Sequence, residues 1–191
     1  MPFTTSFTQY DFRLRNDDGS ETTATWVAAV NTNASLNVDT NYRVRFSIIN
    51  GGTGGWTDKT FNLYYSKNGG AYEAIGSGKP VKFAASGNFV QGDDTTQQLS
   101  ATGTYITDNN AMCESAGATN SGVASSFFEV EFCIQIDSNY VNNGDTIALR
   151  VYFVSVALST YSATPSITVV KGSAPASVPR PPAALDCLMV Y

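Results

Sequence analysis

Few side chains in this sequence are of types that do chemistry, and histidine is absent from its 191 residues. The usual general base, the His-dependent triads and the commonest transition-metal ligand are therefore missing. Acidic residues gather at Asp17, Asp18 and Glu21, and again at Asp93 and Asp94. With neighbouring Asn and Thr oxygens they could bind calcium, and two of them across a cleft could hydrolyse a glycoside. The spacing is not that of an EF-hand, and Asp and Asn are common in turns, so we predict no catalytic residue, no metal and no cofactor.

The three cysteines, Cys113, Cys133 and Cys187, form no CxxC motif and are odd in number. Two interpretations stay open. All three can be free thiols of a protein made in a cytoplasm, or Cys187 can pair with another subunit.

Aromatic residues make up 12% of the chain and offer another kind of site. Trp26, Trp56 and the tyrosines could form a platform on which a sugar ring stacks, although aromatics in β-sandwiches usually pack the core. Trp56 follows glycine-rich sequence at 51–55, which predicts a loop position, whereas Trp26 is expected in the core. A glycan is therefore kept as an alternative ligand.

Charge and composition disfavour several classes of protein. Net charge is −5 and only 14% of residues are charged, below the usual roughly 25%. The nearest thing to a basic cluster, Arg13, Arg15, Arg43 and Arg45, alternates along strands, so we expect pairing with Glu or Asp on neighbouring strands and no nucleic-acid binding. No apolar run approaches the roughly 18 residues that span a bilayer, and the N-terminal residues do not resemble a signal peptide. We expect a soluble, non-secreted protein without a membrane partner.

Short runs in which apolar and polar residues alternate predict an all-β domain. Turn residues separate these runs every roughly 8–12 positions, and Lys67-Asn68-Gly69-Gly70 is a strong hairpin signal. We predict an antiparallel β-sandwich, jelly-roll or Ig-like, over residues 1–171. Its expected strands are 12–15, 21–30, 41–50, 61–65, 71–75, 81–83, 128–137, 147–153 and 166–170.

The clearest pattern lies in 127–154, where two alternating runs flank an Asn- and Gly-rich turn. The two runs are predicted to be neighbouring antiparallel strands whose apolar residues point to the core. The opposite face is predicted to be solvated, and it carries Glu129, Glu131, Gln135 and Arg150. Nothing in this pair indicates a catalytic site, so function is expected in the irregular loop at 91–118 or in the C-terminal arm.

Residues 172–191 differ in composition from the domain before them. Residues 172–184 are rich in Pro, Ala and Ser, which predicts an extended, polyproline-II-like arm. It ends in an apolar tip at 185–191, which is expected to dock on a neighbouring protein. The predicted partner contacts are Leu185, Cys187, Leu188, Met189, Val190 and Tyr191 in the tip, with Tyr105 and Trp56 in the domain.

Several segments carry a resemblance to a known module. They are FRLRNDDGSETTATW at 12–26, RVRFSIIN at 43–50, YYSKNGGAYEAI at 64–75, VKFAASGNFVQGDDTTQQLS at 81–100, FEVEFCIQI at 128–136 and GDTIALRVY at 144–152. In this order they resemble a β-rich module of structural proteins of tailed bacteriophages and prophages. The resemblance covers roughly residues 10–170 and leaves out the C-terminal arm.

The resemblance implies a virion protein that is not an enzyme, and it brings no catalytic or ligand residues. A short, single-module chain with a docking tip fits a capsid decoration (cement) protein, which binds the outer head surface, stabilises it and is often a homotrimer. Its partner would be the major capsid protein or another virion protein, and it would be made in the host bacterial cytoplasm. The first alternative is a tail- or fibre-associated protein that binds a receptor or glycan. The second, an enzyme such as a depolymerase, is disfavoured by the absence of histidine.

Overall fold

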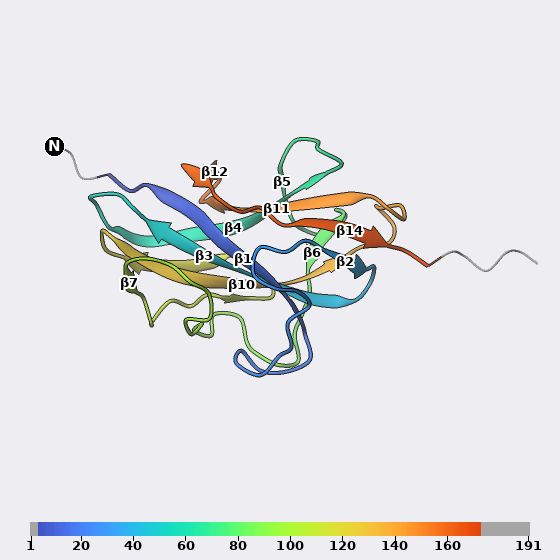
Figure 1. Ribbon diagram of the computed structural model, residues 1–191, viewed down its shortest axis with the longest axis horizontal. Coiled ribbons are helices and arrows are strands. Elements are labelled where there is room, and N and C mark those ends of the chain that lie inside the picture. The colour runs from blue at the N-terminus through green and yellow to red at the C-terminus, as the bar shows by residue number, and fades with distance from the viewer. Residues whose placement is uncertain (1–3, 173–191) are drawn as a thin grey trace, which may run out of the picture.

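The computed structural model describes residues 4–172, which form two curled β-sheets and no helix (Figure 1). Each sheet has seven strands. No helix in the described part of the chain is long and apolar enough to cross a membrane. The predicted all-β class is confirmed. The predicted arm and tip lie outside the described residues, apart from Gly172.

Sheet A contains seven strands, of which three are long. They are β1 (Phe7–Asn16), β3 (Asn41–Asn50), β6 (Val81–Phe83), β7 (Thr104–Tyr105), β8 (Met112–Cys113), β10 (Ser126–Ile136) and β13 (Thr160–Tyr161). The order is β13-β1-β3-β10-β6, and β7 and β8 also pair with β10. The central pairs β1–β3 and β3–β10 are antiparallel.

Sheet B lies opposite sheet A. Its strands are β2 (Ala34–Asn37), β4 (Trp56–Lys67), β5 (Glu73–Ala74), β9 (Ala118–Gly122), β11 (Thr146–Phe153), β12 (Val156–Ala157) and β14 (Ser166–Val170). The order is β2-β14-β11-β4-β5, with β9 on β4 and β12 on β11. The central pairs β4–β11 and β11–β14 are antiparallel.

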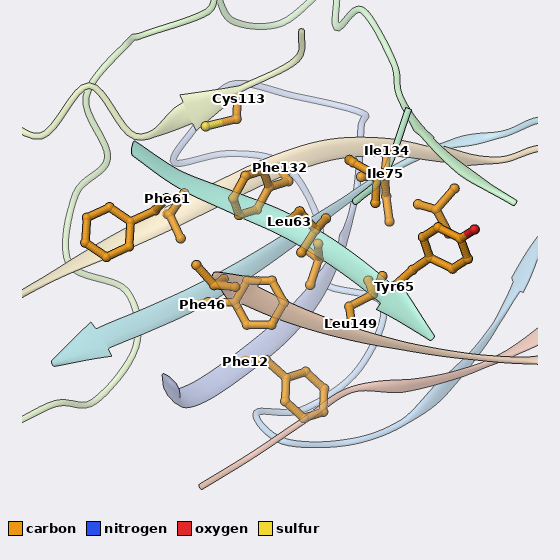
Figure 2. Packing of buried hydrophobic residues seen from close by; sticks show 14 of the residues in the cluster. Phe12, Phe46, Phe61, Leu63, Tyr65, Ile75, Cys113, Phe132, Ile134 and Leu149 are labelled. Atoms are coloured by element: carbon orange, nitrogen blue, oxygen red, sulfur yellow. The ribbon is translucent and has the colours of Figure 1, made fainter. Parts of the chain in front are cut away.

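The hydrophobic core lies between the sheets, where the inward side chains of both meet (Figure 2). Phe46 and Phe132 enter it from sheet A, and Leu63 and Leu149 from sheet B. Across the gap, Phe61 of β4 packs edge-on against Phe128 of β10, with ring centroids 4.8 Å apart. Burial of one face from each sheet is consistent with a β-sandwich.

Alternation located most of the strands correctly. β3 and β14 coincide with the strands predicted at 41–50 and 166–170. The predicted hairpin joins β4 to β5, and its central residues Asn68 and Gly69 have φ of 51° and 74°. Positive φ at both central positions is what a tight hairpin turn needs, so the Asn-Gly signal is confirmed.

The predicted pairing of the two strands within 127–154 is wrong. β10 pairs with β3 in sheet A, whereas β11 pairs with β4 in sheet B, so the chain crosses between sheets after Ile136. Alternation reports which side of a strand is apolar, and both strands turn their apolar sides to the same core. It does not report the partner strand.

The strand predicted at 21–30 is also wrong. These residues form turns, with one isolated bridge between Arg15 and Trp26. Two of their backbone carbonyls accept hydrogen bonds from the Arg15 side chain: Nε donates to Ala24 O at 3.0 Å, and Nη1 donates to Glu21 O. Tertiary hydrogen bonds therefore override the β propensity of Thr and Val in this segment.

Phe46→Ala is expected to lower the free energy of unfolding by about 3–5 kcal/mol, because it leaves a cavity in a closed core. Denaturant unfolding measures the difference. Tyr10→Ala is the matched control, since Tyr10 is 42% exposed, and it is expected to change stability by about 0.5 kcal/mol or less. Equal losses in the two variants would contradict the described packing.

Candidate functional site

The outer face of sheet A carries a buried network of charged side chains. Its members on the strands, each at most 1% exposed, are Arg15, Arg43, Arg45, Glu129 and Glu131. Two irregular segments, 17–33 and 84–111, cover them and appear in Figure 1 as blue and green loops beside β10. The predicted pairing with acidic residues on the strands is confirmed for Arg15, Arg43 and Arg45, whereas Arg13 donates to Ala28 O. The prediction of a solvated face at Glu129 and Glu131 is wrong.

Glu131 is the centre of this network. Its Oε2 accepts from Arg45 Nε at 2.5 Å and from Arg15 Nη1 at 3.3 Å, while Oε1 accepts from Arg43 Nη1 at 3.0 Å. One carboxylate thus holds three guanidiniums that come from two strands. Charges in so dry a site are sustained only while they are paired and hydrogen-bonded.

Glu129 fastens segment 84–111 to the sheet. Its Oε1 accepts the backbone N–H groups of Gln98 at 2.8 Å and Leu99 at 2.6 Å, and its Oε2 accepts from Arg45 Nη1 at 2.9 Å. Burial raises the pKa of Glu129, and Arg45 and the two backbone donors oppose that shift. The strand carboxylate is therefore the fixed point to which the loop is attached.

Glu21 joins the two covering segments to each other. Its Oε1 accepts from Arg45 Nη2 at 2.5 Å, from the Thr96 N–H at 3.0 Å and from Gln98 Nε2 at 2.8 Å. Burial opposes ionisation of Glu21, but the Arg45 guanidinium and the Thr96 donors outweigh it and lower the pKa of Glu21. Segment 17–33 is thus tied to segment 84–111 through an ionised carboxylate.

The other acidic loop residues also serve these segments. Arg43 Nε lies 2.9 Å from Asp17 Oδ1, as an ion pair without hydrogen-bond alignment. Thr25 donates its hydroxyl and its N–H to Asp18, which lowers the pKa of Asp18. Asp94 accepts two backbone N–H groups, each at 2.8 Å. Among residues 4–172, no group of three or more Asp, Glu and Cys side chains is placed to hold a metal ion.

The prediction that Trp26 lies in the core is wrong. The indole is half-buried on the outer face of sheet A, where the Arg13 and Arg15 guanidiniums lie 4.3 and 4.1 Å from its ring centroid. Such cation–π contacts add to the ion pairs and help to close this face. The signal in the sequence for this network was an Arg-x-Arg pair on β3 and a Glu-x-Glu pair on β10, which the register offsets by two residues so that Arg45 lies opposite Glu131.

The outer face of sheet B presents partly exposed aromatic rings around one arginine. Tyr64 of β4 and Tyr152 of β11 stack with ring centroids 3.9 Å apart and planes at 12°. Beside them, the Arg150 guanidinium lies 4.6 Å from the Tyr72 ring centroid and 4.2 Å from that of Tyr161, which comes from the edge strand β13 of sheet A. We call these five residues the tyrosine–arginine platform. The solvated strand predicted at Arg150 is a stacked surface instead.

Hydrogen bonds hold one corner of the platform in place. Tyr161 donates its hydroxyl to Val151 O at 2.9 Å and accepts the Leu158 N–H at 2.9 Å. Burial raises the pKa of Tyr161 to about 12, so the phenol stays protonated at neutral pH. Rings that are already fixed lose little conformational freedom on binding, and Tyr and Arg are enriched where proteins bind proteins. The platform is therefore suited to recognition of a partner surface.

Tyr105, one of the predicted contact residues, fastens segment 84–111. Its hydroxyl donates to Thr95 O at 2.7 Å, and its ring packs edge-on against Phe127 with centroids 5.2 Å apart. Burial raises the pKa of this phenol to about 12. A role for Tyr105 in binding a partner stays a prediction, as does that of the tip residues at 185–191, which lie outside the described part.

The prediction that Trp56 lies on a loop is wrong, because Trp56 is the first residue of β4. It is 6% exposed, and its Nε1 donates to Asn120 Oδ1 at 3.0 Å. An exposed Trp56 platform for sugars is therefore not formed. The indole instead lines a pocket of about 440 Å³ with Ile106, Gly122 and Val123. We call this the Trp56 pocket.

The structure describes two of the three cysteines. Cys113 and Cys133 are buried free thiols. Burial raises the pKa of Cys133 to about 12, which keeps it in the unreactive thiol form. Cys187 lies outside the described residues, so pairing between subunits stays a prediction.

Glu131→Ala is expected to cost about 3–5 kcal/mol of stability, because it leaves buried guanidiniums without their shared partner. Glu73→Ala is the matched control, since Glu73 pairs with Lys79 on the surface, with side-chain exposures of 52% and 46%. An exposed pair of this kind is worth about 1 kcal/mol or less. Denaturant unfolding of both variants gives the comparison, and a similar small loss in both would show that the network does not hold the fold.

Glu21→Gln is expected to reduce the loss of stability on acidification. The pKa of Glu21 is lowered from 4.5 in the folded chain. Glu21 therefore stabilises the fold above pH 4.5 and loses this contribution as the pH falls through its folded pKa. The variant should be less stable than the wild type at pH 7, and the gap should narrow as the pH falls below 4.5. Thermal unfolding between pH 7 and 3 measures the gap; a constant gap would refute the assignment.

The two outer faces thus differ in kind. The outer face of sheet A is covered by segments that pair with its charged side chains, whereas the outer face of sheet B leaves aromatic rings and a guanidinium partly exposed.

Comparison of the chain with protein-family models, with curated proteins and with solved structures found no match.

Proposed function

We propose that the chain is a non-enzymatic virion structural protein of a tailed bacteriophage and acts as a capsid decoration protein on the outer head surface. Support comes from the ordered segments that resemble the phage module, FRLRNDDGSETTATW and RVRFSIIN among them. The major capsid protein, or another virion protein, is its partner, and a homotrimer is the favoured form. Such proteins repeat one modest contact many times over a lattice, so that multivalency supplies the stability.

The tyrosine–arginine platform is the observation that carries this proposal. Interface hot spots are enriched in Tyr and Arg, and the five side chains gather in one place. Of the five, Tyr161 also packs against the core. The arginines of the other outer face are already committed to Glu129 and Glu131. The platform is therefore the surface that we assign to the capsid.

We also propose that the sandwich is of the Ig-like type. Sheet A carries β1, β3, β10 and β6 in that order, and sheet B carries β14, β11 and β4. Lettered A to G in chain order, these are the ABED and GFC sheets of the immunoglobulin fold, with β5 added beside β4. This order favours the Ig-like type over the jelly-roll.

A tail- or fibre-associated protein that binds a glycan is the second candidate. One observation favours it: the stacked rings of Tyr64 and Tyr152 form a flat aromatic surface on the outer face of sheet B. Sugar rings pack on such surfaces through their apolar faces.

Binding to heads that were assembled without the protein tests the main proposal. We expect the wild type to saturate heads of the encoding phage in co-sedimentation. Arg150→Ala combined with Tyr152→Ala should weaken binding at least about tenfold, since each removes a hot-spot side chain. Tyr10→Ala is the matched control, because Tyr10 is an exposed tyrosine outside the platform, and it should bind like the wild type.

The same three proteins on a glycan array separate the two candidates. Silence on the array with tight binding to heads supports decoration. Binding to a glycan that the platform variant loses, together with no binding to heads, would replace decoration by glycan recognition. A platform variant that binds heads as tightly as the wild type would remove the platform from the proposal.

A further inference from the structure

We propose that the apolar tip at 185–191 of one copy binds in the Trp56 pocket of a second copy, so that copies join head to tail. This surface is separate from the platform, and the contact forms without a capsid. The inference draws on the apolar lining of the pocket and on its position relative to the end of β14.

The Trp56 pocket has a preformed apolar lining. The indole is held by its hydrogen bond to Asn120 and by edge-on packing against Phe7, with ring centroids 5.0 Å apart. Gly122 lies so close to the indole that an added Cβ would collide with it. Val123 on the rim is 64% exposed, so the pocket ends in an apolar side chain that faces water. The volume, about 440 Å³, lies in the range of sites that accept ligands.

The pocket and the exit of the arm lie at opposite ends of β10. At the first end, the Ile106 N–H donates to Phe127 O at 2.9 Å, which fixes the pocket wall beside the start of the strand. Beyond the other end, Lys171 Nζ donates to Ser138 O at 2.7 Å, just after Ile136 closes the strand. Figure 1 shows the same arrangement, with β7 near one end of the molecule and the tip of β14 at the other.

Reach favours a second copy over the same copy. β10 has 11 residues, or about 36 Å at roughly 3.3 Å per residue. Residues 173–184 reach about 37 Å if they are extended as polyproline II at roughly 3.1 Å per residue. To fill its own pocket, the tip would need a reversal directly after Gly172 and the whole reach of the arm. A second copy can instead offer its pocket along the direction in which β14 leaves.

The chemistry of the tip matches this pocket. Leu188, Met189 and Val190 are consecutive apolar residues. The pocket, which Thr57 and Ser121 also line, offers them the apolar side chains of Trp56, Ile106 and Val123, and these remove apolar groups from water. Contacts between two different patches are heterologous, and they form a closed ring when the rotation between copies closes. A ring of three is the favoured homotrimer, although the inference holds for any closed ring.

Two variants of the full chain break opposite halves of the contact. Leu188→Asp with Met189→Asp disables the tip, and Val123→Glu places a charge on the rim of the pocket. We expect the wild type to be oligomeric and each variant to be monomeric in sedimentation velocity, in reducing buffer and without heads. Val90→Glu is the matched control, since Val90 is 66% exposed on segment 84–111, and it should assemble like the wild type.

Mixing the two variants gives the sharpest readout. The tip variant keeps its pocket and the pocket variant keeps its tip, so an equal mixture should form dimers and nothing larger. A monomeric wild type would overturn the proposal, and this is the result if the pocket holds the tip of the same copy or residues 1–3. A mixture without dimers would overturn it as well. Circular dichroism and thermal unfolding check that each variant is folded.

Two further results are kept distinct from these. Oligomers that vanish in reducing buffer would point to disulfides of Cys187 and would count against the pocket. Normal assembly without binding to heads would count against the proposed decoration function alone, because the tip–pocket contact needs no capsid.

Discussion

The carboxylate of Glu131, shared by three guanidiniums, is the interaction on which the rest of the structure depends. Removing so many charges from water is costly, and the cost is offset only while every partner stays in place. Sheet A can therefore keep Arg and Glu on its outer face only when segments 17–33 and 84–111 close over them. Those segments have little regular structure of their own, and the buried charges supply many of the bonds that order them.

This requirement divides the molecule into a closed face and an open one. On sheet A the buried charged residues are paired with one another within the chain, and the Trp26 ring covers the Arg13 and Arg15 guanidiniums. On sheet B one arginine is held between tyrosines that remain partly exposed, so its capacity to bind is not used up. Only 14% of the residues are charged, and several of these charged side chains are buried under the covering segments. The proposed recognition of a partner therefore rests on aromatic and small polar groups.

Much of the fold was predictable, and the misses have a common origin. Strands β3 and β14 and the Asn68-Gly69 turn follow from local rules of alternation and backbone conformation. The pairing of Arg and Glu was also expected, since their alternation on neighbouring strands suits cross-strand contacts. The burial of those pairs was not expected, because polar residues on the outer face of a sheet ordinarily face water. Trp56 was misplaced for a similar reason: glycines before it indicated a loop, but its indole packs against Phe7.

The sequence by itself determined which side of the long strands faces the core between the sheets, where the tight turn falls, and that no imidazole chemistry is available. The tertiary structure alone decided that β10 and β11 belong to different sheets, and that Glu131 is a buried centre and not a solvated residue. The reason is physical. Alternation is a property of one strand and its two faces, whereas pairing and burial depend on distant segments, as with Arg15 and Glu131, which lie 116 positions apart.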